Sequence, residues 1–542
     1  MKRLFFLLTI CATMFAACSK DDGAKETPGP GGTITEIEEG NDVYGVITDT
    51  KGNRMEGVVV SDGFTVVATD HNGCYQFKRS SDAVYVFYST PADCEIAIES
   101  GSPCFYKALQ PKVERYDFQL RRLDAPETRF KLFCLADPQS KNATYNARFI
   151  NETMPVVKAE VEASDVPCYG VTLGDIVYTE GSTNTVGNMV PMRNAMRTTF
   201  SGGMPIFQTI GNHDNNFAPV QADSKSSTFN LAFQRQFEYV FGPIDYSWNR
   251  GDAHIISMRD IQYTTNTASN SYQRAFTDEQ YEWLKADLSH VDKDKMIIFC
   301  IHIPLVNSNT PHVQDVLNLL KEYKEVHIMA GHTHYGRNYI YSDKMYEHIH
   351  GAVCGAFWYS NLNGDGTPNG FAIYDVNGTT IDNWFYRGVN EQMNDRDFQL
   401  RLYRGNAATG GSYETFQFAY GSDVVLANVF NADKDWTVQL YENGVLSGDM
   451  TLIPYKSKEE KPSTTSAQDW WAIGYNVGVV GRGHNGGTRS NYCTACYHMY
   501  KYTLKDPSAA VKVVATDPFG RTYECDKFYS GSDYSSATPP TY

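Results

Sequence analysis

Apolar runs alternate with helix-like segments through the middle of the chain, from Phe130 to about Asn377. Short, continuously apolar runs are typical of buried strands, and their alternation with helical periodicity predicts a layered α/β domain. The string Thr277-Asp278-Glu279-Gln280 has the spacing of a capping box and predicts the start of one of the helices. The predicted strands are Lys131–Ala136, Cys168–Leu173, Ile206–Ile210, Ala253–Met258, Met296–Ile301 and Val326–Ala330.

Regions rich in short strands flank this α/β domain on both sides. From Asp42 to about Leu123, brief apolar runs are separated by Gly and Asp turns, which predicts a small β-sandwich. From about Asp397 alternating strands return and predict a second β domain. The predicted domains are residues 42–125, 126–390 and 391–542.

The first residues of the chain have the pattern of an export signal. Lys2 and Arg3 precede an apolar run, Leu4–Phe15, that is too short to span a bilayer permanently. The string Ala16-Ala17-Cys18 that follows resembles the lipobox of bacterial lipoproteins, and this resemblance implies that Cys18 is lipidated. An ordinary signal peptide with an incidental cysteine is the alternative.

We therefore predict a lipoprotein signal peptide at residues 1–18 and a flexible tether at residues 19–41, which contains the Pro/Gly-rich stretch Thr27–Gly32. Ser19-Lys20-Asp21-Asp22 resembles the acidic export tag of some bacterial surface lipoproteins. The expected location is the cell envelope, with the lipid in the outer membrane and the protein exposed at the surface.

The charge of the chain is strongly negative, with 47 Lys and Arg against 63 Asp and Glu and a net charge of -16. Proteins that wrap nucleic acid need a basic surface, so the composition argues against that class of partner. An acidic protein still attracts phosphate groups when metal ions supply positive charge locally.

The chain has 12 cysteines, and their spacing does not dictate pairs. In an exported protein disulfides are permitted, and Cys94 and Cys104 are spaced to bridge a loop. Cys493 and Cys496 have the spacing of a disulfide or of half a metal site, with a structural or incidental role as the simpler interpretation.

Potential metal ligands directly follow five of the predicted strands. Because ligands gather beyond the carboxyl ends of strands in an open α/β sheet, we expect these residues to converge. Oxygen and imidazole donors suit Zn, Mn or Fe, and a carboxylate such as Asp175 has two oxygens with which to bridge two ions. The five segments are Ala136-Asp137-Pro138-Gln139, Gly174-Asp175, Gly211-Asn212-His213-Asp214, Phe299-Cys300-Ile301-His302 and Gly331-His332-Thr333-His334.

The order of these segments from Asp137 to His334 resembles that of the calcineurin-like metallophosphoesterase superfamily. The resemblance implies a four-layer α/β/β/α sandwich for the central domain. The stretch that begins with Gly45-Val46-Ile47-Thr48-Asp49 is similar to carboxypeptidase-regulatory-like domains. Some exported members of the superfamily have this layout of an N-terminal β-sandwich, a catalytic centre and a C-terminal β domain.

The resemblance also implies roles for the individual residues. One divalent ion would be held by Asp137, Gln139, Asp175 and His334, and the other by Asp175, Asn212, His302 and His332. His213 would stay unligated and, steadied by Asp214, would protonate the leaving-group oxygen or stabilise its developing charge, because an alkoxide is a poor leaving group. The implied reaction is in-line attack of metal-bound hydroxide on a phosphate monoester or diester.

The first motif departs from the common Asp-x-His pattern, because Gln139 stands in the place of the histidine. An amide oxygen is usually a weaker ligand than imidazole for these metals. Two alternatives therefore stay open. Gly174-Asp175-Ile176-Val177-Tyr178 resembles the purple acid phosphatase motif in which the tyrosine, here Tyr178, binds ferric iron. The chain could also be a lipoprotein that binds glycan or envelope material and has a degenerate metal site.

Loops that follow the predicted site segments supply candidates for the substrate wall, namely Asn307, Arg337 and Trp358. The planar guanidinium of Arg337 is suited to phosphate oxygens. Histidines in strand-like stretches are interpreted instead as residues of the core or its rim, namely His254, His348 and His350. The expected substrate is a small-molecule or envelope phosphate ester.

Overall fold

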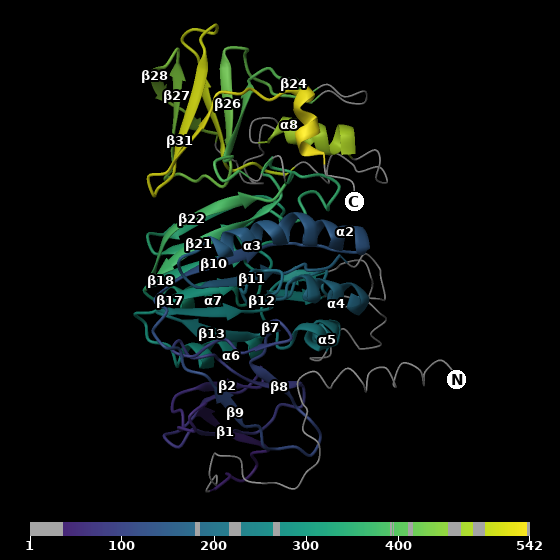
Figure 1. Ribbon diagram of the computed structural model, residues 1–542, viewed down its shortest axis with the longest axis vertical. Coiled ribbons are helices and arrows are strands. Elements are labelled where there is room, and N and C mark those ends of the chain that lie inside the picture. The colour runs from purple at the N-terminus through teal and green to yellow at the C-terminus, as the bar shows by residue number, and fades with distance from the viewer. Residues whose placement is uncertain are drawn as a thin grey trace, which may run out of the picture.

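The computed structural model has three parts stacked along one axis, with the N-terminal strands at one end, a central α/β domain and the C-terminal strands at the other end (Figure 1). Cys18 lies outside the described residues, so the lipid anchor stays a prediction. Among the described helices, none has both the length and the apolar character needed to cross a membrane. The structure describes residues 36–178, 185–215, 229–263, 272–390, 393, 395–409, 416–453, 468–480 and 494–538.

Two mixed sheets form the centre of the molecule, and the strands that carry the predicted site are parallel within each sheet. The first sheet has the order β12 (Ile206–Thr209), β11 (Cys168–Leu173), β10 (Arg129–Leu135), β21 (Gly370–Asn377) and β22 (Thr380–Gly388). The second has the order β13 (Tyr246–Arg250), β14 (Ala253–Ser257), β17 (Met296–Cys300), β18 (Glu325–Ala330), β20 (Met345–Ile349) and β19 (Arg337–Ser342).

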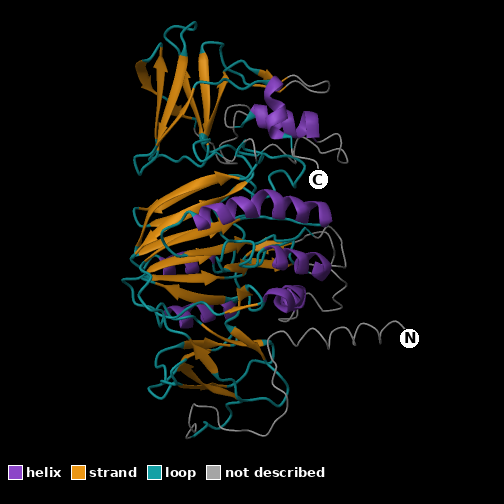
Figure 2. Ribbon diagram, viewed as in Figure 1, coloured by secondary structure: helices purple, strands orange, loops and turns teal. Residues whose placement is uncertain are grey.

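Helices cover the outer face of each sheet (Figure 2). Those that pack on the first sheet are α2 (Ala143–Arg148), α3 (Met154–Glu162), α4 (Thr185–Ala195) and α5 (Phe229–Phe241), with a π-helical turn at Phe149–Thr153 between α2 and α3. Those that pack on the second sheet are α6 (Asp278–Leu288) and α7 (Val313–Leu320). A short hairpin of β15 (Ile261–Tyr263) and β16 (Tyr272–Arg274) lies beside the second sheet.

Alternate residues of the central strands face different layers, because successive side chains of a strand point to opposite sides. In β10, Leu132 and Cys134 belong to the core between the two sheets, whereas Phe133 packs against the helices of the first sheet. In β17, Ile298 belongs to the same inner core and Phe299 packs against the helices of the second sheet. These three cores separate four layers, so the predicted α/β/β/α architecture is confirmed.

The predicted strands agree with the observed ones within two residues at each end, and Cys168–Leu173 agrees at both ends. The predicted capping box is also present. The Thr277 hydroxyl accepts a hydrogen bond from the Gln280 amide at 3.1 Å, and the Gln280 side chain accepts one from the Thr277 amide at 3.0 Å. Local sequence signals were therefore sufficient to predict these strands and the start of this helix.

The N-terminal part is built of two small sheets that pack against α5, α6 and the edge strand β13 of the central domain. The indole of Trp283 in α6 donates a hydrogen bond to the Ser61 hydroxyl at 3.0 Å, and the Tyr85 hydroxyl donates one to the Glu238 carbonyl of α5 at 2.7 Å. One sheet contains β4 (Cys74–Phe77), β1 (Val43–Asp49) and β9 (Phe118–Leu120). The other contains β3 (Val66–Ala68), β2 (Val59–Ser61), β5 (Tyr85–Tyr88) and β8 (Tyr106–Ala108), and a separate hairpin is formed by β6 (Ile98–Glu99) and β7 (Ser102–Pro103).

The C-terminal part also consists of two sheets, with one additional helix, α8 (Trp470–Tyr475), which continues into a π-helical turn at Asn476–Val480. One sheet contains β23 (Leu400–Arg404), β26 (Val424–Val429), β30 (Met499–Thr503) and β29 (Thr451–Leu452). The other contains β28 (Val445–Asp449), β27 (Thr437–Glu442), β31 (Val511–Thr516) and β32 (Thr522–Cys525). A two-stranded ribbon of β24 (Ala408–Thr409) and β25 (Phe416–Gln417) and a 3-10 helix at Gly531–Ala537 complete it.

Three of the four cysteines for which the spacing allowed a disulfide are described by the structure, and these three are free. Cys94 is buried with its thiol near Asp93, and the thiol of Cys104 lies near Glu99, so the two are not joined. Cys496 is a buried free thiol, and Cys493 lies outside the described residues.

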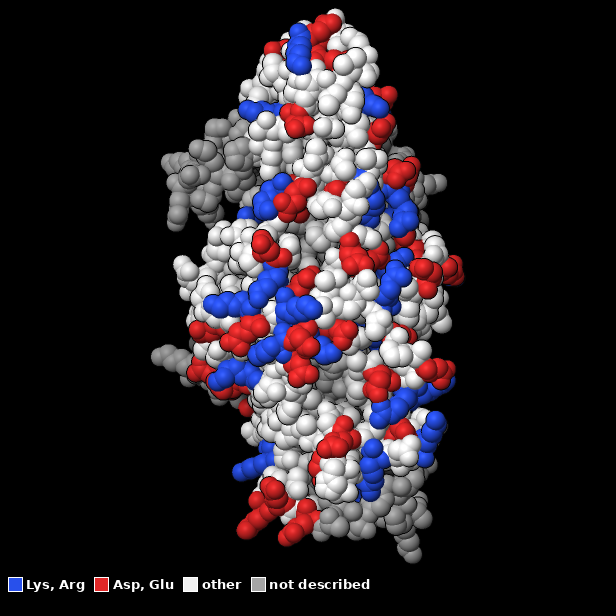
Figure 3. Space-filling model, turned by 90° about the vertical axis from the view of Figure 1, so that its left-hand side faces the viewer, with Lys and Arg blue, Asp and Glu red and all other residues white. Residues whose placement is uncertain are grey.

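Acidic and basic side chains are interspersed over the side of the molecule drawn in Figure 3. Neighbouring pairs on the surface include Lys295 with Asp252 at 2.7 Å and Lys512 with Glu524 at 3.1 Å. The negative net charge is therefore distributed among mixed charges on this side rather than gathered into one acidic field.

The histidines interpreted as core residues are buried and hydrogen-bonded. His254 lies between Asn249 and Asp287, with both ring nitrogens 2.8 Å from side-chain oxygens. The Nδ1 atom of His350 donates to the Ala330 carbonyl at 2.9 Å, so its Nε2 atom accepts the hydroxyl of Tyr374 at 2.8 Å. This arrangement requires a neutral imidazole, and burial lowers the pKa of His350 to about 4.

We expect the replacement His350→Gln to flatten the acid side of the stability profile. An unfolded histidine titrates near a pKa of about 6.5, so between that value and about 4 protons bind preferentially to the unfolded chain. Stability is therefore lost as the pH falls through this window, by about 3 kcal/mol for the full difference in pKa. Urea denaturation at several pH values should show the difference in unfolding free energy between wild type and variant shrinking in acid.

The matched control is His71→Gln, since His71 is exposed in a turn. This control should follow the wild-type profile over the same pH range. A difference between wild type and His350→Gln that stayed constant in acid would show that His350 does not have the lowered pKa that its contacts indicate.

Candidate metal centre

The loops that follow five parallel strands bring the predicted ligands to one edge of the two sheets. In the first sheet, β10 ends at Leu135 before Asp137, and its neighbour β11 ends at Leu173 before Asp175. In the second sheet, His302 follows the last residue of β17 by two positions. Because parallel strands end at the same edge, residues more than a hundred positions apart in sequence meet there.

Glycines permit the close approach of these loops. Gly174 has a positive φ of 82°, and a Cβ atom there would lie 2.5 Å from Nδ1 of His302. A Cβ atom at Gly211 would lie 2.0 Å from the backbone nitrogen of Asp175. A side chain at Gly174 would push the loops of the two sheets apart, and one at Gly211 would separate two loops of the first sheet, which explains the glycines seen before Asp175 and Asn212 in the sequence.

Most of the predicted ligands have an unusual backbone conformation. Positive φ is uncommon for residues other than glycine, and such strain concentrates at functional sites. Five of the seven predicted metal ligands have it, namely Asp137 (50°), Gln139 (38°), Asp175 (50°), His332 (70°) and His334 (53°). The fold therefore holds these residues in conformations that an isolated loop would seldom adopt.

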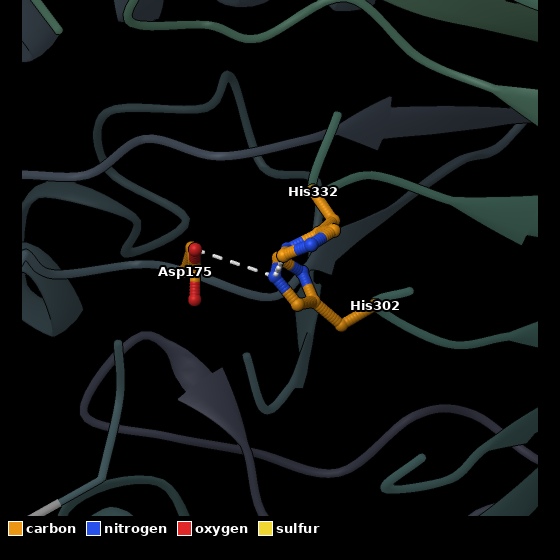
Figure 4. Close-up of side chains that lie close together, drawn as sticks. All are labelled: Asp175, His302 and His332. Carbon is orange, nitrogen blue, oxygen red and sulfur yellow. Dashed lines mark hydrogen bonds and ion pairs between the residues drawn. The ribbon is translucent and has the colours of Figure 1, made fainter. Parts of the chain in front are cut away.

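The tightest cluster surrounds the Nε2 atom of His302. This atom lies 2.9 Å from Oδ1 of Asn212, 3.2 Å from Nδ1 of His332 and 3.3 Å from Oδ2 of Asp175. The carboxylate and the two imidazoles come from three different loops and face one another (Figure 4). The four residues predicted to hold the second ion therefore converge on one point.

The donor atoms of this cluster fit a metal ion. Nδ1 of His302 donates to the carbonyl of Leu173 at 2.8 Å, which leaves Nε2 as the ligand atom. Two ligand atoms that are each about 2.0–2.1 Å from one zinc-sized ion lie roughly 3 to 3.5 Å apart. The separations of Nε2 of His302 from His332 and Asp175 fall in this range, and the separation from Asn212 is 0.1 Å shorter.

The charges of the cluster also favour a bound cation. Burial opposes ionisation of Asp175, but the neighbouring imidazole of His302 outweighs it and holds the pKa of this carboxyl below its ordinary range. Burial likewise disfavours a charged His302, but the neighbouring Asp175 raises the pKa of this imidazole to about 10. The buried carboxylate is thus stabilised by positive charge, which a divalent ion supplies more strongly than a proton.

The residues predicted for the first ion form a second group beside this cluster. Oδ1 of Asp137 lies 3.4 Å from Nε2 of His334, while Nδ1 of His334 faces the carbonyl of Gly355 at 3.1 Å. The side-chain nitrogen of Gln139 donates to Oδ2 of Asp175 at 3.0 Å, and its buried oxygen has no hydrogen-bond partner among the described residues. That oxygen is suited to a metal. The group therefore fits the first ion, which it would hold with weaker donors than those around Nε2 of His302.

His213 lines the cavity of the site, and the ring of Tyr178 packs beside its imidazole. Their rings are 4.5 Å apart, and the backbone amide of His213 donates to Oδ1 of Asp175 at 2.7 Å. Burial lowers the pKa of His213 below 6.5, so its imidazole is neutral near pH 7.

Asp214 hydrogen-bonds to the backbone of the loops that carry the predicted ligands. Its carboxylate accepts hydrogen bonds from the amides of Val177 and Gly211, at 2.9 Å and 2.8 Å. These bonds tie the loop after β11 to the loop after β12. Asp214 thus supports the loop that carries His213.

A cavity of about 170 Å³ opens beside these ligands. Of the predicted residues, its wall contains Gln139, Asp175, His213, His332 and His334. The wall also contains residues that the sequence analysis missed, namely Thr333, Phe357 and Thr494. Thr333 had a signal, because it stands between two predicted ligands, whereas nothing in the sequence near Thr494 pointed to the site.

The three residues predicted for the substrate wall are not part of this cavity among its described lining. Asn307 is exposed. The guanidinium of Arg337 lies 4.2 Å from the ring centre of Tyr497 and so packs on an aromatic side chain. Trp358 is buried and its indole donates to the carbonyl of Pro138 at 2.7 Å, so it supports the first ligand loop from behind.

The two packed sheets and the ligand-bearing loops at their common edge define an α/β/β/α protein with a metal-binding centre. Three models of calcineurin-like phosphoesterases match consecutive parts of the chain. The N-terminal model matches residues 41–123, the calcineurin-like phosphoesterase model matches residues 135–336, and the C-terminal model matches residues 347–523. The chain belongs to the calcineurin-like metallophosphoesterase superfamily, and the predicted family is confirmed.

Curated relatives include two plant enzymes. A purple acid phosphatase from Glycine max is 29% identical over 160 residues, which are 27% of this chain and 32% of that protein. Purple acid phosphatase 18 from Arabidopsis thaliana is 28% identical over 183 residues, 32% of this chain and 38% of that protein. The chain thus matches about a third of the length of each relative.

Similar solved structures share little sequence with the chain. A dimetal phosphatase from Danio rerio has a TM-score of 0.31 at 14% identity, over 46% of this chain and 93% of that one. A 5'-nucleotidase from Candida albicans has a TM-score of 0.31 at 13% identity, over 49% and 53% of the two chains.

We expect Gln139→His to tighten the binding of the first ion, since imidazole is the stronger donor and histidine tolerates a positive φ. The gain should be about ten- to a hundred-fold in affinity, the range typical of one change in a metal's surroundings. Metal retained per chain after dialysis against increasing chelator measures it. The control is Gln314→His at an exposed position of α7, and equal retention in both variants would contradict the assignment of Gln139.

Proposed function

We propose that the protein hydrolyses a small phosphate ester with the help of two divalent ions. The observation that supports this most directly is the convergence of Asp175, Asn212, His302 and His332 on one point in the wall of a cavity. Bound ions would lower the pKa of a water molecule and offset the negative charge of the phosphate group. The identity of the two ions, among Mn, Zn and Fe, is left to measurement.

The chain's own residues would then orient the ester and its leaving group. Asp175 is placed between the two ligand groups, with contacts to Gln139 on one side and His302 on the other. The neutral imidazole of His213 lines the cavity and offers an N–H group to the leaving oxygen. A hydrogen bond there would stabilise the charge that develops as the ester bond breaks.

The cavity has enough room for a phosphate group beside the ligands, at about 170 Å³. The names of the similar proteins, which include phosphatases and a nucleotidase, agree with a phosphate ester of this kind.

We expect Asp175→Asn to abolish the hydrolysis of an aryl phosphate after chelation and restoration of metal, because the variant loses the carboxylate shared by both groups. His213→Ala should keep its metal but lose about 10² to 10⁴ in kcat, with the larger loss on esters with poor leaving groups. Initial rates and metal content measured on the same samples test both statements.

The matched control for the second variant is His290→Ala, at an exposed histidine of the same domain. It should have wild-type rates. Full metal-dependent turnover by Asp175→Asn would refute the assigned site. A wild-type chain with neither bound metal nor activity on monoesters and diesters would favour the predicted binding protein with a degenerate site.

A second candidate is a purple-acid-phosphatase type of centre, favoured by the relatives of that name and by the position of Tyr178 beside His213. If Tyr178 binds ferric iron, the iron-loaded protein should have a visible charge-transfer band that Tyr178→Phe removes. Absorption spectra of the two iron-loaded proteins decide this. Equal spectra of wild type and variant would reject the candidate and leave Tyr178 as a residue that packs beside His213.

A further inference from the structure

One residue of the cavity wall comes from outside the central domain. Thr494 belongs to the C-terminal part and precedes β30, yet it lines the same cavity as His213 and His334. Thr333, between two metal ligands, lines this cavity as well. The wall of the metal centre is therefore completed by a segment more than a hundred residues away from the last ligand.

The two threonine hydroxyls are available to a ligand. Both Oγ1 atoms are buried, and neither has a hydrogen-bond partner among the described residues. A buried hydroxyl without a partner is costly, so protein hydroxyls in such positions usually bind something. In a cavity beside metal ligands, the oxygen atoms of a phosphate group are acceptors that match these donors.

A buried network fixes the segment that carries Thr494. Nε2 of His498, four residues further on, lies 3.1 Å from Oδ2 of Asp365, and its Nδ1 lies 2.7 Å from Oδ1 of Asn428. The same oxygen of Asp365 accepts a hydrogen bond from the amide of Gly336 at 2.7 Å. Gly336 is two residues after the ligand His334, so one carboxylate joins the C-terminal segment to the ligand loop.

Aromatic contacts hold the other side of this segment. The rings of Tyr497 and Tyr335 are 5.4 Å apart, and the guanidinium of Arg337 lies 4.2 Å from the ring centre of Tyr497. Tyr335 directly follows the ligand His334. The segment 494–498 is thus attached to the loop 332–337 through both a charged network and stacked rings, which fixes Thr494 relative to the ligands.

We propose that Thr494 is a substrate-binding residue that the C-terminal domain supplies, and that its hydroxyl, together with that of Thr333, donates a hydrogen bond to an oxygen of the phosphate ester. This inference rests on the proposed function for the identity of the ligand. Substrate selection by the enzyme then depends on the interface between two domains as well as on the metal ligands.

The experiment compares the metal-loaded full-length chain with Thr494→Val, because valine has nearly the shape of threonine and lacks the hydroxyl. A hydrogen bond to a charged group is worth about ten- to a hundred-fold in affinity, so we expect KM to rise by about tenfold or more while kcat and metal content stay close to wild type. The dissociation constant of inorganic phosphate, measured by calorimetry, should rise in parallel. Thr333→Val should have the same kind of effect.

Two further variants make the test specific. Thr494→Ser keeps the hydroxyl and should bind phosphate within about twofold of wild type. Thr503→Val makes the same replacement at an exposed threonine at the end of β30 and should be unchanged. Thr494→Ala removes the hydroxyl without a new apolar contact, so it replaces the valine variant if that protein fails to fold.

The outcomes separate this inference from the proposed function. Wild-type KM and phosphate affinity in Thr494→Val or Thr494→Ala, in an active enzyme, would overturn the role of Thr494 alone. If the wild-type chain hydrolyses no ester but its phosphate binding weakens in Thr494→Val, the proposed function fails and the phosphate contact stands. Equal losses in Thr494→Val and Thr503→Val would also overturn the inference, because the effect would not come from the cavity.

Discussion

The face-to-face packing of the two central sheets is the interaction on which the metal centre depends. Asp137, Asp175 and Asn212 follow strands of the first sheet, whereas His302 and His332 follow strands of the second. Neither sheet alone holds a complete set of ligands for either ion. The inner core contains fully buried side chains of both sheets, and each such side chain contributes about 1.5–3 kcal/mol. The apolar core between the two sheets therefore sets the distance between the ligands of one sheet and those of the other.

The free energy gained from that packing offsets the free-energy costs of forming the metal centre. Positive φ at five ligand positions stores about 1–3 kcal/mol at each residue. The carboxylates of Asp137 and Asp175 are almost wholly buried, and a buried charge is unfavourable without a partner. Bound metal would repay part of this cost, because a ligand that binds only the folded chain stabilises it. The loops are consequently rigid where they carry ligands and depend on the sheets for that rigidity.

Local signals in the sequence predicted the six central strands, the start of α6 and the ligand segments, because each depends on neighbouring residues alone. The strand β13 was missed, since Ser247, Asn249 and Arg250 interrupt its apolar pattern. All three hydrogen-bond to the N-terminal domain, and Arg250, although fully buried, donates to the carbonyl of Cys94 at 2.8 Å. Trp358 was predicted to line the substrate wall. The sequence alone does not show which of the two neighbours faces the cavity, and in the structure it is Phe357.

The contact between the central and C-terminal domains includes a buried hydrogen-bonded network, whereas the two central sheets are held together by apolar packing. Burial opposes a charge on His498, but Cys496 and Asp365 outweigh it and raise the pKa of this imidazole to about 10. The imidazole therefore stays charged near neutral pH, and its hydrogen bonds to Asp365 and Asn428 have a fixed direction that apolar contacts lack. A buried pair of this kind adds little net stability, yet breaking it is costly, so it restricts the interface to one arrangement. Since the same carboxylate binds the amide of Gly336, the arrangement of the C-terminal domain and that of the ligand loop are determined together.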